Sequence, residues 1–106
     1  MLTNVEKSFV IQLVNNWIEM SILNHAGKDT ELSERAVNGS LWEVCKINPE
    51  KFEDVEREII NICLAKNQQS RAMNIIDYYE HNRSVVMDIQ AHGKGKDYFL
   101  NLIENK

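Results

Sequence analysis

Apolar residues recur every three or four positions along almost the whole chain, and this spacing restricts the fold more than any other feature. The first segment shows it in two interleaved series, Phe9, Leu13 and Trp17, and then Val10, Val14 and Ile18. Such spacing places apolar side chains on one face of an α-helix. The chain has only four glycines and one proline, too few for a turn-rich β-sandwich. We therefore expect an all-α protein.

The first helix is predicted over residues 4–25. Thr3 and Glu6 have the spacing of a capping box, in which each side chain binds the backbone of the other residue. Gly27 is the predicted stop, because glycine readily adopts the left-handed conformation that ends many helices. A second helix is predicted to begin after Asp29 or Thr30. Its inner face would consist of Leu32, Ala36, Val37, Leu41, Val44 and Cys45. Gly39 would either permit a close helix contact or break the helix.

The sharpest local signal is the sequence Asn48-Pro49-Glu50. Asparagine suits an N-cap, proline suits the first helical position, and an acid suits the positive end of the helix dipole. A third helix is therefore predicted from residue 49 to about 66. Its buried face would comprise Phe52, Val55, Ile59, Ile62 and Cys63.

The last third of the chain is predicted to form a turn at 67–70 and then three short helices. The fourth helix would bury Met73, Ile76 and Tyr79 and end near His81 and Asn82. Ser84 would cap a fifth helix that contains Val85, Val86 and Ile89, although a strand over 84–89 stays open. Residues 92–96 are expected to be the least regular, followed by a helix over 97–104 that docks Phe99, Leu102 and Ile103. Residues 1–106 would thus form one compact domain of five or six short helices, and their short connections allow stacked α-hairpins.

The sequence contains no motif for catalysis, metal binding or cofactor binding. It lacks HExxH, Cys/His and EF-hand patterns, and the GKGK at 93–96 has neither the spacing nor the preceding strand of a P-loop. His25, His81 and His92 lie near predicted helix ends, where they complement the helix dipole. The alternative is an acid–base set of histidines and a lysine for RNA cleavage. We expect no enzymatic activity, no metal and no cofactor.

Cys45 and Cys63 each lie in an apolar run, without a CxxC partner. Two buried free thiols in a reducing compartment are expected, with a disulfide or a reactive thiol as the alternative. The first residues lack the basic segment of a secretion signal, and no uncharged apolar run has membrane-spanning length. We therefore expect a cytoplasmic location without membrane contact.

Negative charge is concentrated in the second quarter of the chain. The net charge is −4, but residues 29–58 alone hold nine acids and four bases. An acidic surface repels nucleic acid and attracts basic proteins. We predict a partner-binding surface made of exposed acids and aromatic anchors: Glu31, Glu34, Trp42, Glu50, Glu53, Asp54, Asp77, Tyr78 and Glu80. The alternative for these residues is a solvated helix face, with Trp42 and Tyr78 in the periphery of the core. Glu56 falls inside an apolar arc and either reaches solvent at its edge or binds something.

In size, acidity and predicted class, the whole chain resembles the small helical immunity proteins of bacterial contact-dependent growth inhibition systems, although no diagnostic motif carries the resemblance. Residues 41–103 also resemble a family of small helical bacterial domains of unknown function. That family shows a tryptophan, then D-P-E, then an L-E-D-L-L-x-x-H-G-like segment. Here Trp42, the tripeptide at 48–50 and the segment IDYYEHN at 76–82 occupy these places, with Asn82 in place of the glycine. This second resemblance implies a fold and no activity.

The first resemblance implies a protein that binds a co-encoded toxin domain and occludes its active site. A basic nuclease is the expected partner, because a site that binds phosphate is positive and complements carboxylates. No direct nucleic-acid binding is expected, and self-association is left open. Two alternatives remain: an inhibitor encoded by a phage against a host defence complex, and a small helical nucleic-acid-binding module that uses Lys94, Lys96, Arg71 and Arg83.

Overall fold

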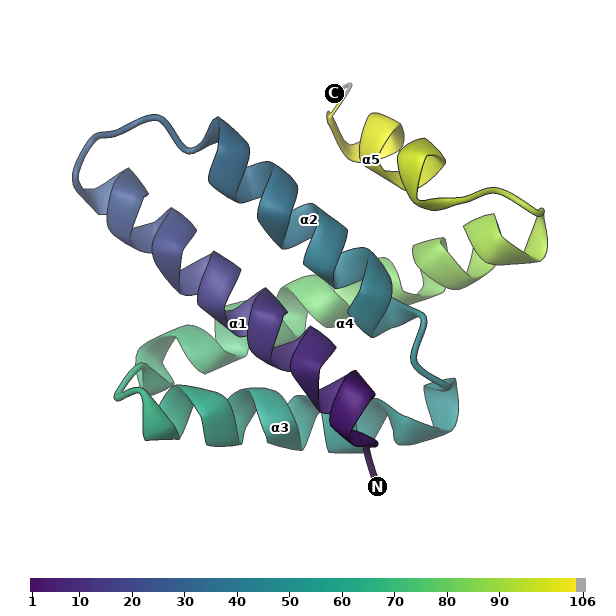
Figure 1. The fold of residues 1–106 in the computed structure, drawn as a ribbon, viewed down its shortest axis with the longest axis horizontal. Helices are drawn as coiled ribbons and strands as arrows, with labels where there is room; N and C mark the ends of the chain where they lie inside the picture. The colour runs from purple at the N-terminus through teal and green to yellow at the C-terminus, as the bar shows by residue number, and fades with distance from the viewer. Residues whose placement is uncertain (105–106) are drawn as a thin grey trace.

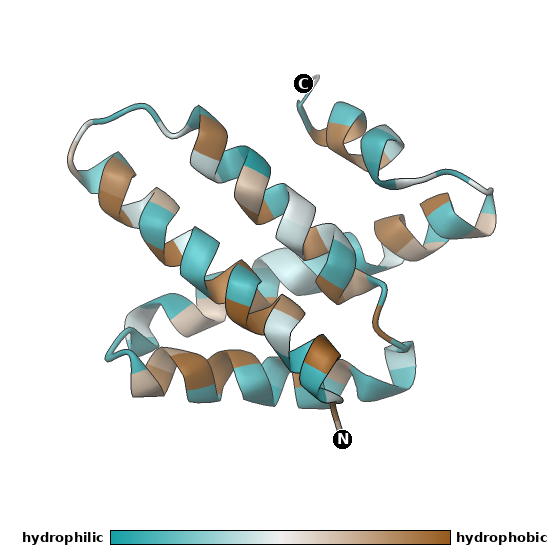
Figure 2. Ribbon diagram, viewed as in Figure 1, coloured by the Kyte–Doolittle hydropathy of each residue, from teal (hydrophilic) through white to brown (hydrophobic). Residues whose placement is uncertain are grey.

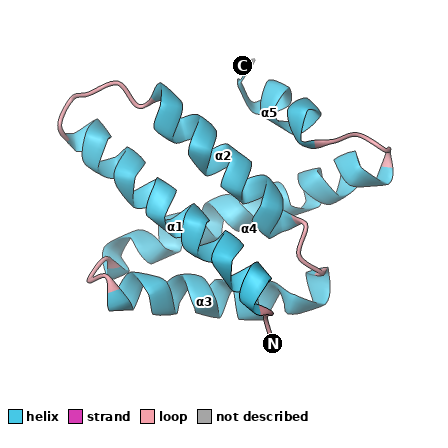
Figure 3. Ribbon diagram, viewed as in Figure 1, coloured by secondary structure: helices cyan, strands magenta, loops and turns pink. Residues whose placement is uncertain are grey.

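The computed structural model describes residues 1–104 and confirms the all-α class (Figure 1, Figure 3). Within these residues there are five α-helices, one short 3-10 turn and no strand. The helices are α1 (Asn4–His25), α2 (Glu31–Cys45), α3 (Phe52–Ala65), α4 (Gln69–Ala91) and α5 (Lys96–Glu104), and the turn η1 (Pro49–Lys51) leads directly into α3. None of the helices formed by residues 1–104 is long and apolar enough to cross a membrane.

Two helical hairpins cross to make the body of the molecule. Helices α1 and α2 form one hairpin and α3 and α4 form the other, and α4 passes behind α1 and α2 in Figure 1. Helix α5 lies against α2 and against the end of α4. The described residues measure 39 × 34 × 20 Å. The short dimension corresponds to two layers of helix, since each helix is about 10 Å across. The predicted arrangement of stacked hairpins is thus what the chain forms.

The start of α1 has the predicted capping box. The Thr3 hydroxyl accepts a hydrogen bond from the Glu6 backbone N–H at 3.1 Å, and the Glu6 carboxylate accepts one from the Thr3 N–H at 2.8 Å. The same carboxylate oxygen binds the Lys51 ammonium at 2.9 Å, which ties α1 to η1. The Thr3 backbone N–H and the Lys51 side chain together lower the pKa of Glu6. At the other end Gly27 has a φ of +69°, as predicted.

Replacing Thr3 with alanine is expected to lower the free energy of unfolding by about 1 kcal/mol. The substitution removes the acceptor for one N–H of the first helical turn, which has no partner inside the helix. Urea denaturation followed by circular dichroism measures the change. Gln12→Ala on the exposed face of α1 serves as the control and is expected to stay within about 0.5 kcal/mol of the parent chain. Equal stability of the two variants would contradict a role for the box.

Hydrophobic residues recur along each helix (Figure 2), and buried residues from all five helices form one hydrophobic cluster. Its fully buried side chains come from every predicted stripe: Val10, Leu13, Val14, Val37, Leu41, Val44, Val55, Ile59, Ile75, Tyr79, Val86 and Phe99. Their burial removes apolar surface from water, which is the main force that holds helices of this length together. Cys45 and Cys63 are both free and buried. Burial raises the pKa of the Cys45 thiol to about 12, so the thiol stays protonated near neutral pH and is a poor nucleophile.

The predicted division of α4 into two helices is wrong. The helix runs unbroken through His81, Asn82 and Ser84, and Ser84 caps nothing. Residues 82–84 are polar, but the buried positions continue across them at helical spacing, from Tyr79 to Val86 and Ile89. The Asn82 side chain donates to the Tyr78 carbonyl at 2.9 Å within the same helix. Because α4 buries one face along its length, the local capping signal does not end it. The strand considered for 84–89 is likewise helical.

Four side chains predicted to pack in the core are exposed. Leu32 is 82% exposed, Met73 is 61% exposed and Leu102 is 52% exposed, and Ala36 is also exposed. Leu32 lies in the first turn of α2, at the end away from α4 in Figure 1. Gly39 does not break α2. A Cβ atom on it would lie 3.4 Å from the Cε atom of Lys96, which is an ordinary van der Waals contact with a flexible side chain, so the approach of α5 to α2 does not require glycine at this position.

Candidate functional site

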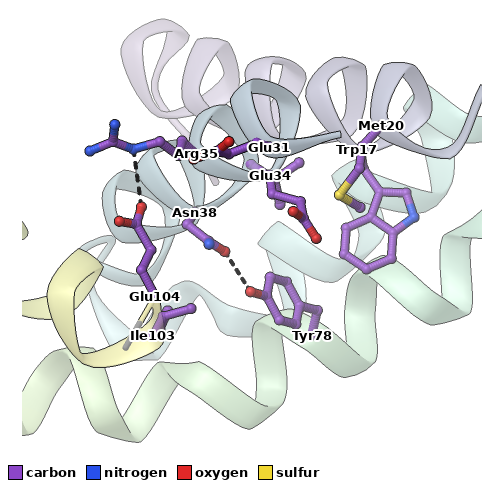
Figure 4. Close-up of a pocket in the computed structure, with 10 residues that line it drawn as sticks. Trp17, Met20, Glu31, Glu34, Arg35, Asn38, Tyr78, Ile103 and Glu104 are labelled. Carbon is purple, nitrogen blue, oxygen red and sulfur yellow. Dashed lines mark hydrogen bonds and ion pairs between the residues drawn. The ribbon is translucent and has the colours of Figure 1, made fainter. Parts of the chain in front are cut away.

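A cleft of about 700 Å³ brings together three of the residues predicted to bind a partner. Glu31 and Glu34 reach it from α2 and Tyr78 reaches it from α4 (Figure 4). Helices α1 and α5 complete the walls, so residues far apart in the sequence meet only through the crossing of the two hairpins. Clefts of this volume are typical of ligand-binding sites.

Glu31 and Glu34 occupy the first turn of α2, and both are exposed. The Asp29 carboxylate caps this turn by accepting a hydrogen bond from the Glu31 N–H at 3.0 Å. Acids at this position also stabilise the helix through its dipole. Neither glutamate forms an ion pair within residues 1–104. Their negative charges are therefore available to a ligand in the cleft.

Tyr78 and Trp17 form the aromatic part of the cleft. Their ring centroids are 5.3 Å apart and the rings are tilted by 53°. The Tyr78 hydroxyl donates a short hydrogen bond to the carboxamide oxygen of Asn38, which fixes the position of the ring. Burial is the largest cause of a raised pKa at Tyr78, and the nearby negative charge of Glu34 adds to it. The Tyr78 hydroxyl is thus neutral and close to a carboxylate.

Helix α5 supplies the far rim of the cleft through Ile103 and Glu104. The Glu104 carboxylate accepts from the Arg35 side chain at 3.2 Å, and this ion pair joins α5 to α2. Three carboxylates and one guanidinium line the cleft, which leaves it with a net charge of −2 at neutral pH. The arrangement repels anions and attracts cations.

The other predicted acids do not line this cleft. Glu50 and Glu53 are exposed near the start of α3, on the opposite side of the molecule from the start of α2 in Figure 1. Asp54 binds the Met1 amino group at 2.9 Å and Arg57 at 3.1 Å, and the first of these contacts is the largest cause of its lowered pKa. Its charge is therefore already compensated. The acidic segment does not form one surface.

Asp77 and Glu80 are exposed on α4, outside the cleft. The proposed anchor role of Trp42 is contradicted, because its side chain is only 4% exposed. Its ring packs against Phe99 with centroids 5.5 Å apart, and this contact holds α5 on α2. Trp42 lies off the centre of the apolar stripe of α2 because it contacts α5. The spacing of apolar residues along α2 alone does not indicate this contact.

Sequence reasoning missed Trp17, Asn38 and Glu104 as site residues. Trp17 lies in the apolar stripe of α1, and this spacing indicates packing in the core rather than a place in a cleft. Asn38 carried a usable signal, because it is a polar residue on the buried face of α2 and is only 7% exposed. Buried carboxamides are normally held by hydrogen bonds. No sequence pattern indicates that Glu104 lines the cleft, because its position depends on how α5 packs against α2.

A second polar cluster lies between α3 and α4. The guanidinium carbon of Arg83 sits 4.7 Å from the centroid of the Phe52 ring and 5.5 Å from that of Tyr79. Glu56 is partly buried there, and its Oε2 atom makes no hydrogen bond within residues 1–104. Burial is the largest cause of a pKa of about 7 at Glu56, the neighbouring carboxylate of Glu80 adds to it, and Arg83 opposes it. Glu56 thus lies at the edge of the apolar face of α3, as one of the two interpretations expected, but its Oε2 atom is buried and does not reach solvent.

The histidines do not assemble into a site. His25 lies in the last turn of α1, and the Nδ1 atom of His92 lies 2.8 Å from the Asp88 carbonyl at the end of α4. His81 is exposed within α4, not near a helix end as predicted. Within residues 1–104 no three side chains of histidine, cysteine, aspartate or glutamate are grouped so that they could hold a metal ion.

Comparison of the chain with protein-family models, with curated proteins and with solved structures finds no significant match. Its function therefore has to be inferred from its own residues and geometry, and the cleft between α1, α2, α4 and α5 is the feature that combines shape, charge and aromatic surface.

Proposed function

We propose that this chain is an immunity protein that binds a toxin domain and covers its basic active site. The observation that carries the proposal is the acidic, aromatic cleft of Glu31, Glu34, Trp17 and Tyr78. Tyrosine and tryptophan dominate the binding energy of protein interfaces, and unpaired carboxylates select positively charged partners. A nuclease toxin suits this surface, because an active site that holds phosphate is itself positive.

The size of the chain is compatible with such a role. Its described residues expose 6562 Å², and a standard protein interface buries about 800 Å² on each partner. The cleft and its rim would therefore occupy about an eighth of the surface. Several of the predicted partner-binding acids lie near the start of α3, but the ion pairs of Asp54 compensate its charge. We therefore centre the proposed interface on the start of α2.

The test is protection from a toxin encoded beside this chain. Co-expression with the product of each neighbouring gene is expected to identify one that kills alone and is neutralised by the chain. The double substitution Glu31→Lys and Glu34→Lys is expected to weaken binding by about 100-fold or more and to abolish protection, because like charges then meet across the interface. Glu31→Gln with Glu34→Gln removes the charge without reversing it and is expected to have a smaller effect.

The matched control is Glu50→Lys with Glu53→Lys, which makes the same change in net charge on the start of α3. This variant is expected to protect as well as the parent chain. If the two lysine variants behave alike, the cleft is not the interface. If no neighbouring product is toxic and neutralised, the immunity function is wrong. Capture of a component of a host defence complex would instead favour the inhibitor role.

A further inference from the structure

We propose that the cleft seats one arginine side chain of the partner protein, with the guanidinium against the Glu34 carboxylate and the rings of Trp17 and Tyr78. This inference rests on the proposed function and names the chemistry of the contact. In Figure 4 the Glu34 carboxylate projects into the space between Tyr78 and Trp17. One wall of the cleft thus combines a negative charge with two aromatic surfaces.

This combination fits a guanidinium better than other cations. Arginine is planar, stacks on aromatic rings and donates two parallel hydrogen bonds to a carboxylate. An ammonium ion is a compact and strongly hydrated charge, and it gains less from tilted rings. The chain's own Arg35 does not fill the seat. Its side chain points away from the aromatic pair and is held by Glu104 at 3.2 Å (Figure 4).

Asn38 favours a peptide over a free small cation. Its side chain lines the cleft and is only 7% exposed. The carboxamide oxygen accepts from Tyr78, but the carboxamide nitrogen donates to no residue among 1–104. This nitrogen is not among the fully buried unpaired atoms of residues 1–104. It therefore keeps some exposed surface in the lining of the cleft, where the backbone carbonyl of a peptide would accept a hydrogen bond from it. The volume of about 700 Å³ also exceeds that of one side chain, so the cleft has room for the residues that flank the arginine.

The test titrates the full chain with acetyl-Gly-Arg-Gly-amide and follows the two tryptophan indole N–H signals by NMR. Trp17 lines the cleft, whereas Trp42 is buried against Phe99 and serves as an internal reference. The arginine peptide is expected to shift the Trp17 signal in a saturable way and to leave the Trp42 signal in place. Matched peptides with citrulline or lysine are expected to bind at least about fivefold more weakly, since citrulline has the shape without the charge.

The second part of the test repeats the peptide titration with a variant of the cleft. Glu34→Gln is expected to weaken binding of the arginine peptide by about tenfold, because it removes the charged acceptor. Glu53→Gln on α3 is the matched control and is expected to leave binding unchanged.

Four results would overturn the proposal. If the citrulline peptide binds as tightly as the arginine peptide, the positive charge has no role. If spermidine binds more tightly than the arginine peptide, the cleft is a site for a small polyamine. A Trp17 shift that grows with protein concentration alone would assign it to a second copy of this chain. Absence of any Trp17 shift would show that the seat does not bind arginine. These results are separate from protection, so a neutralised toxin with an unresponsive Trp17 would overturn the seat and keep the proposed function.

Discussion

Phe99→Ala is expected to lower the free energy of unfolding by about 3–5 kcal/mol, the usual cost of truncating a buried phenylalanine. Phe99 is fully buried and is the only buried side chain of α5 among residues 96–104. Its ring lies 5.5 Å from that of Trp42 on α2. The substitution leaves a cavity beside Trp42 and removes the main contact that docks α5. Urea denaturation followed by tryptophan fluorescence measures the loss.

Leu102→Ala is the control on the same helix, because Leu102 is 52% exposed. It is expected to change the free energy of unfolding by less than about 0.5 kcal/mol. Phe99→Ala should also disrupt the cleft, since Ile103 and Glu104 on α5 form its rim. We expect a protease to cleave Phe99→Ala within residues 92–104 faster than it cleaves the parent chain. If Phe99→Ala and Leu102→Ala have similar stability, the docking of α5 described here is wrong.

Glu56→Gln is expected to raise the free energy of unfolding at pH 8 by about 1–2 kcal/mol and to flatten its dependence on pH. Burial and Glu80 raise the pKa of Glu56 from 4.5 to about 7 in the folded chain. A raised folded pKa gives stability that is complete below pH 4.5 and is lost as the pH rises through about 7. The full linkage would be about 3 kcal/mol, and partial exposure of Glu56 reduces it by solvent screening. Glutamine stays neutral over the whole pH range, so it carries no desolvation cost for a charge and no repulsion from Glu80.

The measurement is urea denaturation at pH 5 and pH 8. The parent chain is expected to lose stability between these values, and Glu56→Gln is expected to lose less. Glu19→Gln, at an exposed position on α1, is the control and should keep the pH dependence of the parent. Glu6 works in the opposite direction, because its pKa is lowered. Its contribution is present above the unfolded pKa and disappears only as the pH falls through the folded pKa. A parent chain with equal stability at pH 5 and pH 8 would contradict the Glu56 prediction.

The predicted helix ends are correct where the local capping residues and the limits of the buried helix face coincide. The capping box at Thr3, the stop at Gly27 and the N-cap at Asn48 all occur as expected. The predictions are wrong where a capping residue lies within a continuous buried face. Ser84 resembles a helix start, yet burial of Tyr79, Val86 and Ile89 along one face keeps α4 continuous. Proline after Asn48 began a 3-10 turn, and the α-helix follows from Phe52.

The candidate site was predicted only in part. Glu31, Glu34 and Tyr78 were selected for their exposure and chemical type, and the cleft does contain them. The same reasoning selected Trp42, which α5 covers, and joined Glu31 to Glu50 because both lie in one acidic segment. Nearness in sequence does not place residues on one surface when a helix hairpin separates them.

The sequence by itself determined the helical class, most helix ends and most of the side chains that face inward, because these depend on spacing of three or four residues and on caps within one turn. The tertiary structure alone decided which helices cross, that α5 buries Trp42, and that α1, α2, α4 and α5 enclose a cleft. Those outcomes depend on contacts between residues such as Asn38 and Tyr78, forty positions apart. Such contacts form when the whole apolar surface is buried at once, and no local pattern encodes them.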